Sequence, residues 1–329
     1  MAENPLLALP HLETDRLRVE EELRAAVRAP TPALTEMAGH LVGAGGKRVR
    51  PLFAVAAAAC GAGADGPATV EVLRGGVSVE LVHLGSLYHD DVIDEAVTRR
   101  GIESVNARWG NLRAILAGDF LLARASELAA SLGTEVAGLL AHTIGRLCEG
   151  EVLELQDAYQ VDRTEEAYLA SIEGKTASLL SAACRIGAIV GGLPRPEIDR
   201  LTEFGTAYGM AFQIVDDVLD VIATDEQLGK PAGHDLVEGA YNLPVLRALQ
   251  GPQGPQLREV LGTPIEGAAW ERARSLVREG DAVDQAVSVA RSYVTDAIDL
   301  LAPLEDRPAA VALQGASRHL LEGLAAVRT

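Results

Sequence analysis

Apolar residues recur at helical spacing along nearly the whole chain, from about Leu17 almost to the C-terminus. Steps of three and four residues predict helices, whereas strict alternation of apolar and polar residues, which predicts strands, is rare in this chain. Two segments, Thr69 to Asp94 and Thr202 to Ile222, are apolar around most of their helical surface. Helices of that kind are buried in the centre of a protein. The pattern therefore predicts an all-α fold of about ten or more helices around these two segments.

Clusters of glycine and proline interrupt the helical pattern and mark turns between helices. They fall at residues 61–67, 191–196 and 251–255. None resembles an interdomain linker, and the sequence contains no internal repeat or low-complexity tract. We therefore expect one domain that spans residues 1–329.

The composition agrees with closely packed helices and limits the partners of the protein. Of 329 residues, 48% are hydrophobic but only 4% are aromatic, so Ala, Leu, Val and Ile must fill the core. The formal net charge of −18 argues against nucleic acid as a partner, because nucleic-acid binding needs a broad basic surface. It also argues against a polybasic face that docks on anionic membranes.

The cysteines and the apolar segments predict a cytoplasmic protein without a stable membrane anchor. Cys60, Cys148 and Cys184 are far apart and form no Cys-x-x-Cys pair, which argues against a disulfide framework or a structural zinc site. The first residues lack the basic start and apolar run of a secretory signal. The apolar stretch from Ala177 to Leu193 is interrupted by Arg185 and by serines and glycines, so we do not expect it to span a bilayer.

One acidic pattern occurs twice, each time inside an apolar helical segment. The two copies are Asp90-Asp91-Val92-Ile93-Asp94 and Asp216-Asp217-Val218-Leu219-Asp220. The first and last Asp of each copy are four residues apart and share a helical face, where like charges repel. A solvated acidic face is the alternative for either copy, but its flanks would be polar, and these flanks are apolar. Hard divalent cations such as Mg²⁺ bind carboxylate oxygens and often bridge them to substrate phosphates, so the pattern favours a magnesium site.

Two groups of cations suggest that this acidic protein binds a polyanion. Gly45-Gly46-Lys47-Arg48-Val49-Arg50-Pro51 carries three cations within four residues, and Arg99-Arg100-Gly101 follows the first acidic cluster. Each group could be a solvated turn, but Arg and Lys are also the side chains that bind phosphate oxygens. His83 lies two helical turns before Asp90 on the same face and is either a packed core residue or a phosphate donor.

Together these residues resemble the trans-isoprenyl diphosphate synthases, the polyprenyl synthetase family, and its long-chain bacterial members in particular. The resemblance covers most of the chain. It implies an isoprenoid-synthase type I bundle of helices around a central cavity, as a homodimer. The stretches that carry it are 45–51, His83 through Asp94, 99–101, Gly118-Asp-Phe-Leu-Leu-Ala123, Gly174-Lys-Thr-Ala177, 212–220 and Gly229-Lys-Pro-Ala-Gly-His-Asp235.

The resemblance also implies the site residues. The substrates would be isopentenyl diphosphate and an allylic diphosphate such as dimethylallyl, geranyl, farnesyl or geranylgeranyl diphosphate. Three Mg²⁺ ions would hold the allylic diphosphate. Their ligands would be Asp90, Asp94 and Asp216, with Asp220 acting through water, and Arg99, Lys175 and Lys230 would complete the cage around the allylic diphosphate. Lys47, Arg50, His83 and Arg100 would hold isopentenyl diphosphate. Thr176 and Gln213 would turn oxygen dipoles toward the allylic cation.

This implied chemistry ionises the allylic substrate, lets the isopentenyl double bond attack, and returns a proton to the departing diphosphate. It needs no side-chain nucleophile, and the sequence has no Gly-x-Ser-x-Gly arrangement. One departure from the family is Ala240-Tyr241-Asn242-Leu243-Pro244, where Lys-Thr-Leu-Pro is common after Gly239. The missing Lys puts one minor diphosphate contact in doubt.

The small residues Gly85 and Ser86, before Asp90, predict a long-chain product of about C30 to C50, because an aromatic residue there closes the tunnel of short-chain family members. Alternatively, Gly85 only lets two helices approach closely. The other functions that we consider are a short-chain (C15–C20) synthase, a class I terpene cyclase, a non-catalytic subunit and a helical scaffold. Two intact acidic clusters and the Gly-Gly-Lys-Arg segment argue against the last three.

Overall fold

In a computed structural model that describes residues 5–62, 66–228 and 232–328, the chain folds into helices, as predicted. The first half contains η1 (Pro5–Ala8), α1 (Leu12–Ala26), α2 (Pro32–Gly43), α3 (Val49–Ala59), α4 (Val70–Ile93), β1 (Thr98–Arg99), β2 (Ile102–Glu103), α5 (Val105–Trp109), α6 (Asn111–Ser131), α7 (Thr134–Gln156), α8 (Glu165–Ile172) and the π-helical turn η2 (Glu173–Ala177). The second half contains α9 (Ser178–Val190), α10 (Arg195–Ile222), α11 (Asp225–Leu228), α12 (His234–Glu238), α13 (Leu243–Gln250), α14 (Gly254–Val260), α15 (Ala268–Arg278), α16 (Ala282–Leu301), η3 (Ala302–Leu304) and α17 (Pro308–Arg328).

The two most apolar segments of the sequence form the long helices α4 and α10, which confirms the prediction. Thr69 caps the start of α4, where its hydroxyl oxygen accepts a hydrogen bond from the backbone N–H of Val72. The acidic clusters lie toward the C-terminal ends of these helices. The reason is that α4 ends at Ile93 and α10 at Ile222, where the chain turns into polar loops.

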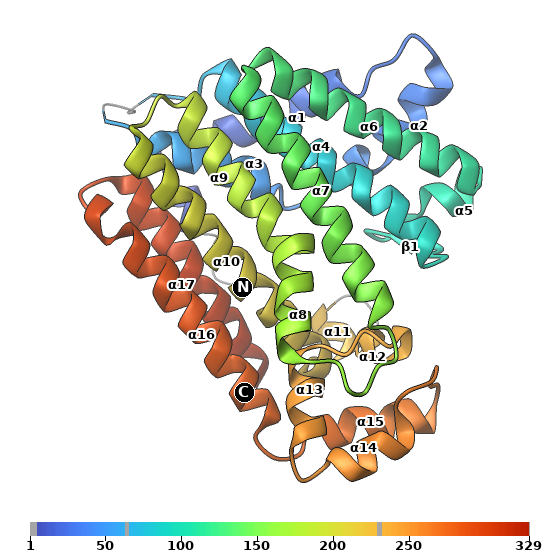
Figure 1. Ribbon diagram of the computed structural model, residues 1–329. Helices are drawn as coiled ribbons and strands as arrows, with labels where there is room; N and C mark the ends of the chain where they lie inside the picture. The colour runs from blue at the N-terminus through green and yellow to red at the C-terminus, as the bar shows by residue number, and fades with distance from the viewer. Residues whose placement is uncertain (1–4, 63–65, 229–231, 329) are drawn as a thin grey trace.

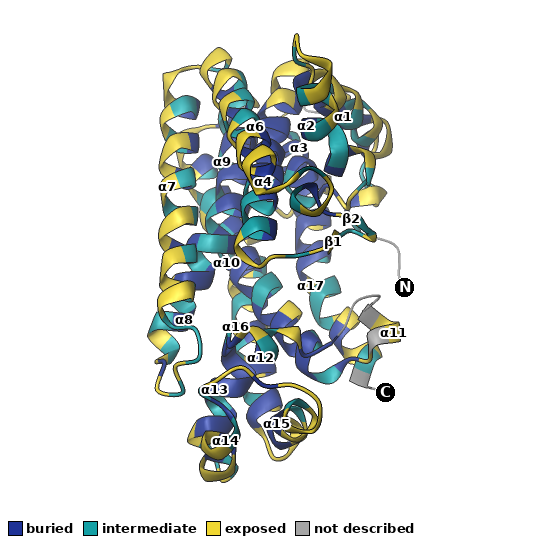
Figure 2. Cartoon of the chain, turned by 90° about the vertical axis from the view of Figure 1, so that its right-hand side faces the viewer, coloured by how far each residue is buried: buried dark blue, intermediate teal, exposed yellow. Residues whose placement is uncertain are grey.

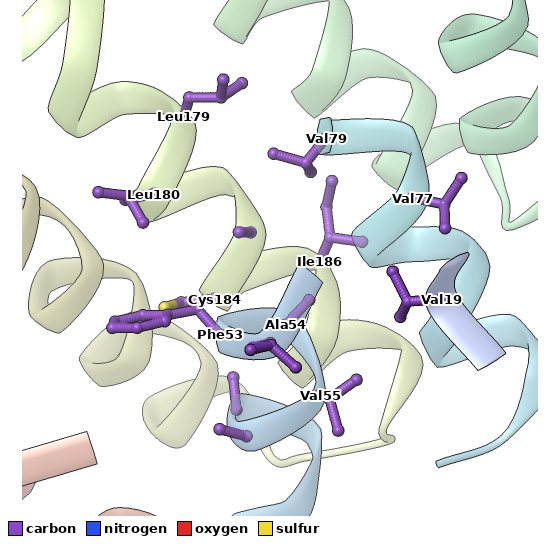
Figure 3. Packing of buried hydrophobic residues seen from close by; sticks show 14 of the residues in the cluster. Val19, Phe53, Ala54, Val55, Val77, Val79, Leu179, Leu180, Cys184 and Ile186 are labelled. Atoms are coloured by element: carbon purple, nitrogen blue, oxygen red, sulfur yellow. The ribbon is translucent and has the colours of Figure 1, made fainter. Parts of the chain in front are cut away.

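Helices α3, α4, α9 and α10 meet in the centre of the molecule (Figure 1). Figure 3 shows how side chains from three of them share one apolar space, with Phe53 from α3, Val79 from α4 and Ile186 from α9. Small residues bring the backbones close together: a Cβ atom on Gly187 of α9 would lie only 2.0 Å from the carbonyl oxygen of Ala54 in α3. The Ala-rich composition therefore serves close helix packing.

The outer helices turn an exposed face to solvent, and buried residues concentrate on the inner ones (Figure 2). Within the described ranges, no helix is both long enough and apolar enough to cross a membrane. The sheet formed by the described residues is a single antiparallel pair of two-residue strands, in which Thr98 pairs with Glu103 and Arg99 with Ile102. Arg100 and Gly101 turn this hairpin with positive φ angles of 54° and 75°.

The close approach of α9 and α3 predicts a large cost for Gly187→Ala. The added methyl group has no room beside the Ala54 backbone, so we expect a loss of about 2–3 kcal/mol in the free energy of unfolding. Gly323→Ala in α17 is the matched control, because nothing lies within 4 Å of its Cβ position and alanine favours a helix. Urea unfolding followed by circular dichroism measures both; equal stabilities for the two variants would contradict this packing.

Candidate active site

The first acidic cluster lies at the C-terminal end of α4. Asp90 and Asp94 are one turn apart, and the backbone N–H of Asp94 donates to the carbonyl of Asp90 at 2.8 Å. Asp91 between them is fully buried and accepts a hydrogen bond from Nε of Arg99 at 2.7 Å. Burial raises the pKa of Asp90 to about 7, and the charge of Glu151 adds to the effect. Because the C-terminus of a helix also carries partial negative charge, a cation would stabilise this end of α4.

The second acidic cluster lies at the corresponding end of α10. Asp216 is exposed, whereas Asp217 and Asp220 are buried. Asp217 accepts hydrogen bonds from the Tyr168 hydroxyl and from Nε2 of Gln213. Burial nevertheless raises the pKa of Asp217 to about 7, although both hydrogen bonds oppose the shift. The middle Asp of each cluster is thus bound by other protein side chains.

The two clusters share one electrostatic environment, because Glu154 of α7 acts on both. Burial raises the pKa of Asp94 and of Asp217, and in each case the charge of Glu154 raises it further. Glu238 of α12 also lies near this region, since the charges of Asp94 and Glu154 raise its pKa in addition to burial. Carboxylates from α4, α7, α10 and α12 therefore gather in one acidic basin.

Lys175 is the cation at the centre of this basin. Its Nζ lies 2.8 Å from Glu151 and 2.7 Å from Glu154, and these two carboxylates raise its pKa although burial opposes the charge. Backbone contact between α7 and η2 places it there, since a Cβ atom on Gly150 would lie 2.4 Å from the backbone nitrogen of Lys175. The π-helical turn at residues 173–177 thus presents Lys175 to α7.

Glu151 and Glu154 are site residues that the sequence analysis missed. They are three residues apart in Gly150-Glu151-Val152-Leu153-Glu154 and so share one face of α7. A pair of acidic residues beside a helical glycine is a weak signal, and only the packing of η2 against α7 shows that they face the Asp clusters.

A basic cluster surrounds His83 on α4. Burial lowers the pKa of His83 well below its usual value, and the neighbouring charges of Arg50, Arg100, Arg48 and Arg99 lower it further. Nε of Arg50 is buried and has no hydrogen-bond partner among the described residues. Burial lowers the pKa of Arg50, and Arg100 adds to that shift. An anion placed here would therefore relieve both desolvation and repulsion.

Arg48 has a different position from the cations on either side of it. Its side chain is buried, and it is bound to Glu20 at 2.7 Å and to Glu80 at 3.2 Å. Arg48 adopts a positive φ of 49° after Gly45 and Gly46, and this turn leaves Lys47 exposed. The internal ion pairs of Arg48 thus support the loop that carries the other cations.

The β1–β2 hairpin brings the second basic segment to the same place. Arg100 donates to the carbonyl oxygens of Gly45 and of Leu41, the latter at 3.3 Å. A Cβ atom on Gly46 would lie 2.9 Å from the Arg100 guanidinium, so the glycine pair makes room for it. Arg99 points to the acidic side through Asp91. The structure therefore brings together Arg50, His83 and Arg100, with Arg99 between the basic and acidic groups.

The remaining predicted residues lie along η2 and α10. The hydroxyl of Thr176 donates to Oε1 of Gln213 at 2.7 Å, so these two are neighbours. Lys230 lies outside the described residues. In the segment that departs from the family pattern, Asn242 donates to Asp235 at 3.0 Å. Burial and then the charge of Asp220 raise the pKa of Asp235, so this carboxyl group is a further member of the acidic basin that the sequence analysis missed.

The donor chemistry of the basin suits a hard divalent cation, because Asp90, Asp94, Asp216 and Asp220 supply only oxygen atoms. Within the described part of the chain, no three His, Cys, Asp or Glu side chains converge closely enough to hold a metal ion by themselves. Ions that bind here would need further oxygen ligands, which water and phosphate can supply.

Comparisons with known proteins identify the family to which the chain is similar. A family model described as polyprenyl synthetase matches residues 31–277. The chain is 41% identical over 292 residues to heptaprenyl diphosphate synthase component 2 of Geobacillus stearothermophilus, which covers 88% of this chain and 90% of that protein. It is 40% identical over 299 residues to nonaprenyl diphosphate synthase of Mycobacterium tuberculosis, with coverages of 90% and 88%.

Solved structures give the same result for the fold. The heptaprenyl diphosphate synthase of Staphylococcus aureus superposes with a TM-score of 0.88 at 31% identity, over 95% of this chain and 98% of that one. A polyprenyl synthase of Caulobacter crescentus, complexed with calcium and isoprenyl diphosphate, has a TM-score of 0.88 at 32% identity, with coverages of 97% and 98%.

Proposed function

The chain belongs to the polyprenyl synthetase family, and from this premise we propose how its residues act as a trans-prenyltransferase with a long-chain product. The reaction condenses isopentenyl diphosphate head-to-tail with an allylic diphosphate. The observation that carries the proposal is the division of the site into an acidic basin and an adjoining basic cluster. Each half suits one diphosphate, held through metal ions in the basin and directly by cations in the cluster.

The acidic half would bind the allylic diphosphate. Three Mg²⁺ ions, held by Asp90, Asp94 and Asp216 with Asp220 acting through water, would neutralise the charge that develops on the diphosphate as the C–O bond breaks. Lys175 lies within this basin and Arg99 lies beside it, and each is held by carboxylate partners. They would add positive charge around the departing group; Lys230 is proposed for the same role.

The basic half would bind isopentenyl diphosphate. Arg50, His83 and Arg100 converge there and Lys47 is exposed beside them. As a neutral imidazole among arginines, His83 would donate one hydrogen bond to the diphosphate. Thr176 and Gln213 would direct oxygen atoms toward the allylic cation that the isopentenyl double bond attacks, and the departing diphosphate would take the proton that is then lost.

Replacement of Asp90 or Asp216 tests this assignment. We expect Asp90→Ala and Asp216→Ala each to lower kcat by about 10³-fold, since each loses a carboxylate ligand for the ions that stabilise the leaving group. Asp299→Ala on the exposed side of α16 is the control and should retain parental turnover. Incorporation of radiolabelled isopentenyl diphosphate with Mg²⁺ and a series of allylic primers measures the rates. Parental rates in either site variant would overturn the metal assignment.

Of the two small residues before Asp90, we propose that Ser86 and not Gly85 faces the growing chain. A Cβ atom on Gly85 would lie 3.2 Å from the carbonyl oxygen of Gly118 and from a side-chain carbon of Leu122, so Gly85 lets α4 approach α6. This favours the second of the two interpretations of that glycine. Ser86 is only half-buried, and its hydroxyl donates to the carbonyl of His83 within α4.

We therefore expect Ser86→Phe to shorten the product, because an aromatic ring one turn from Asp90 would occupy the path of the growing chain. Ser86→Ala is the matched control and should keep the parental length. Reversed-phase chromatography of the dephosphorylated products measures chain length. An unchanged distribution in Ser86→Phe would show that Ser86 does not face the chain.

We further propose that residues 1–329 form a single domain and that the protein is a cytoplasmic homodimer. Helix α16 packs along α10, and α1 packs against α4, so the helices outside the matched range 31–277 join the same bundle. On α6, Leu112, Ile115 and Leu116 are 73%, 41% and 55% exposed and share one face. Exposed apolar residues continue on α7 at Val152, Leu153 and Leu155. A second copy of the chain would cover this surface.

Leu116→Asp tests the dimer, because a buried, unpaired carboxylate would disrupt the interface. We expect the parent to elute at twice the chain mass of 34.6 kDa and the variant to elute as a monomer. Leu17→Asp on α1 is the control, since Leu17 is 56% exposed on another helix. Size-exclusion chromatography with light scattering measures the masses. A dimeric Leu116→Asp variant would place the interface elsewhere.

A further inference from the structure

We propose that Tyr168 and Asp217 are positioning residues that orient the amide of Gln213, and through it the hydroxyl of Thr176, toward the reacting carbon. The inference rests on the proposed function, because it concerns the residues that face the allylic cation. Its basis is a continuous chain of hydrogen bonds that links α8, α10 and η2. Tyr168 and Asp217 touch neither substrate in this proposal and act only through Gln213.

Asp217 is the fixed point of this chain. Its carboxylate is 5% exposed, its Oδ1 accepts from Nε2 of Gln213 at 2.8 Å, and its Oδ2 accepts from the hydroxyl of Tyr168 at 2.5 Å. Gln213 is four residues before Asp217, so both side chains lie on one face of α10. Because both carboxylate oxygens have protein donors, Asp217 differs from the exposed Asp216 beside it.

The carboxylate of Asp217 fixes the orientation of the Gln213 amide group. In its ionised form the carboxylate only accepts hydrogen bonds, so it then faces the NH₂ group of the amide and not the carbonyl oxygen. The carbonyl oxygen is then directed to Thr176, whose hydroxyl donates to it at 2.7 Å. With its proton committed to Gln213, the Thr176 oxygen is left with lone pairs for other partners. The carbonyl oxygen of Gln213 and the hydroxyl oxygen of Thr176 are thereby held next to each other.

Tyr168 is itself held by Arg163 and Ser171. It is 2% exposed, and the guanidinium of Arg163 lies 5.6 Å from the centre of its ring. Ser171 donates to the Tyr168 carbonyl at 2.8 Å and accepts from Arg163 at 2.7 Å. These contacts fix the orientation of the Tyr168 side chain. Its hydroxyl in turn fixes the orientation of the Asp217 carboxylate through their hydrogen bond.

The chemical consequence lies in the transition state. An amide turned the wrong way would present its NH₂ group, the positive end of its dipole, to a developing cation. Preorganised dipoles act on the charge that develops during the reaction, so their loss lowers kcat and leaves ground-state binding nearly unchanged. Tyr168→Phe, which removes one hydroxyl, should therefore lower kcat and leave KM nearly unchanged.

The experiment is a double-mutant cycle of Tyr168→Phe and Gln213→Met, assayed with radiolabelled isopentenyl diphosphate, an allylic primer and Mg²⁺. Tyr241→Phe is the matched control, because Tyr241 is also fully buried but its hydroxyl accepts from the backbone N–H of Gly262, away from Asp217. Circular dichroism melting sets an assay temperature at which every variant is folded. We expect Tyr168→Phe to lower kcat by about 10- to 100-fold, with both KM values within about twofold of the parent.

In the Gln213→Met background, Tyr168→Phe should change kcat by no more than about twofold, because the loss of the Gln213 amide has already broken the series of hydrogen bonds. An equal effect in both backgrounds would overturn the proposal, as would an unchanged kcat in Tyr168→Phe. A main effect on the Mg²⁺ concentration for half-maximal activity would also overturn it, since Asp217 would then act as a metal ligand. A parent that forms no polyprenyl product would instead refute the proposed function itself.

Discussion

Repulsion among carboxylates at the ends of two buried helices is the constraint on which the rest of the structure depends. Each long central helix ends in a pair of acidic side chains one turn apart, where the helix also carries partial negative charge. Glu151 and Glu154 add two more carboxylates from α7, and Lys175 is the cation between them. Positive charge nearby would therefore stabilise this arrangement.

Close backbone contacts make this concentration of charge possible. Glycines at the crossing of α7 and η2, and at the crossing of α3 and α9, remove the side chains that would hold the helices apart. At the first crossing, Gly150 allows the backbone of Lys175 to reach α7. At the second, Gly187 allows α9 to lie against Ala54. The low aromatic content of 4% thus reflects helices packed too closely for many large rings.

The residues in the middle of each Asp-rich motif carry out a different task from their neighbours. Asp91 binds Arg99, and Asp217 binds Tyr168 and Gln213, so both are used inside the protein. Arg48 has a similar supporting role among the cations, because Glu20 and Glu80 bind it. Its neighbours differ, since Lys47 is exposed and Nε of Arg50 has no hydrogen-bond partner among the described residues. Within each short motif, the middle residue therefore supports the scaffold through contacts with other protein side chains.

The sequence by itself determined the helical fold, the two acidic clusters and the two basic segments, because apolar spacing and charge placement are local properties of the chain. It placed Asp90, Asp94, Asp216 and Asp220 on the right helices. Only the tertiary structure decided that Glu151, Glu154 and Asp235 belong to the acidic basin and that Gly85 faces α6. These facts depend on contacts between segments far apart in the chain, such as the approach of η2 to α7, and the spacing of residues along one helix carries no information about which neighbour that helix will meet.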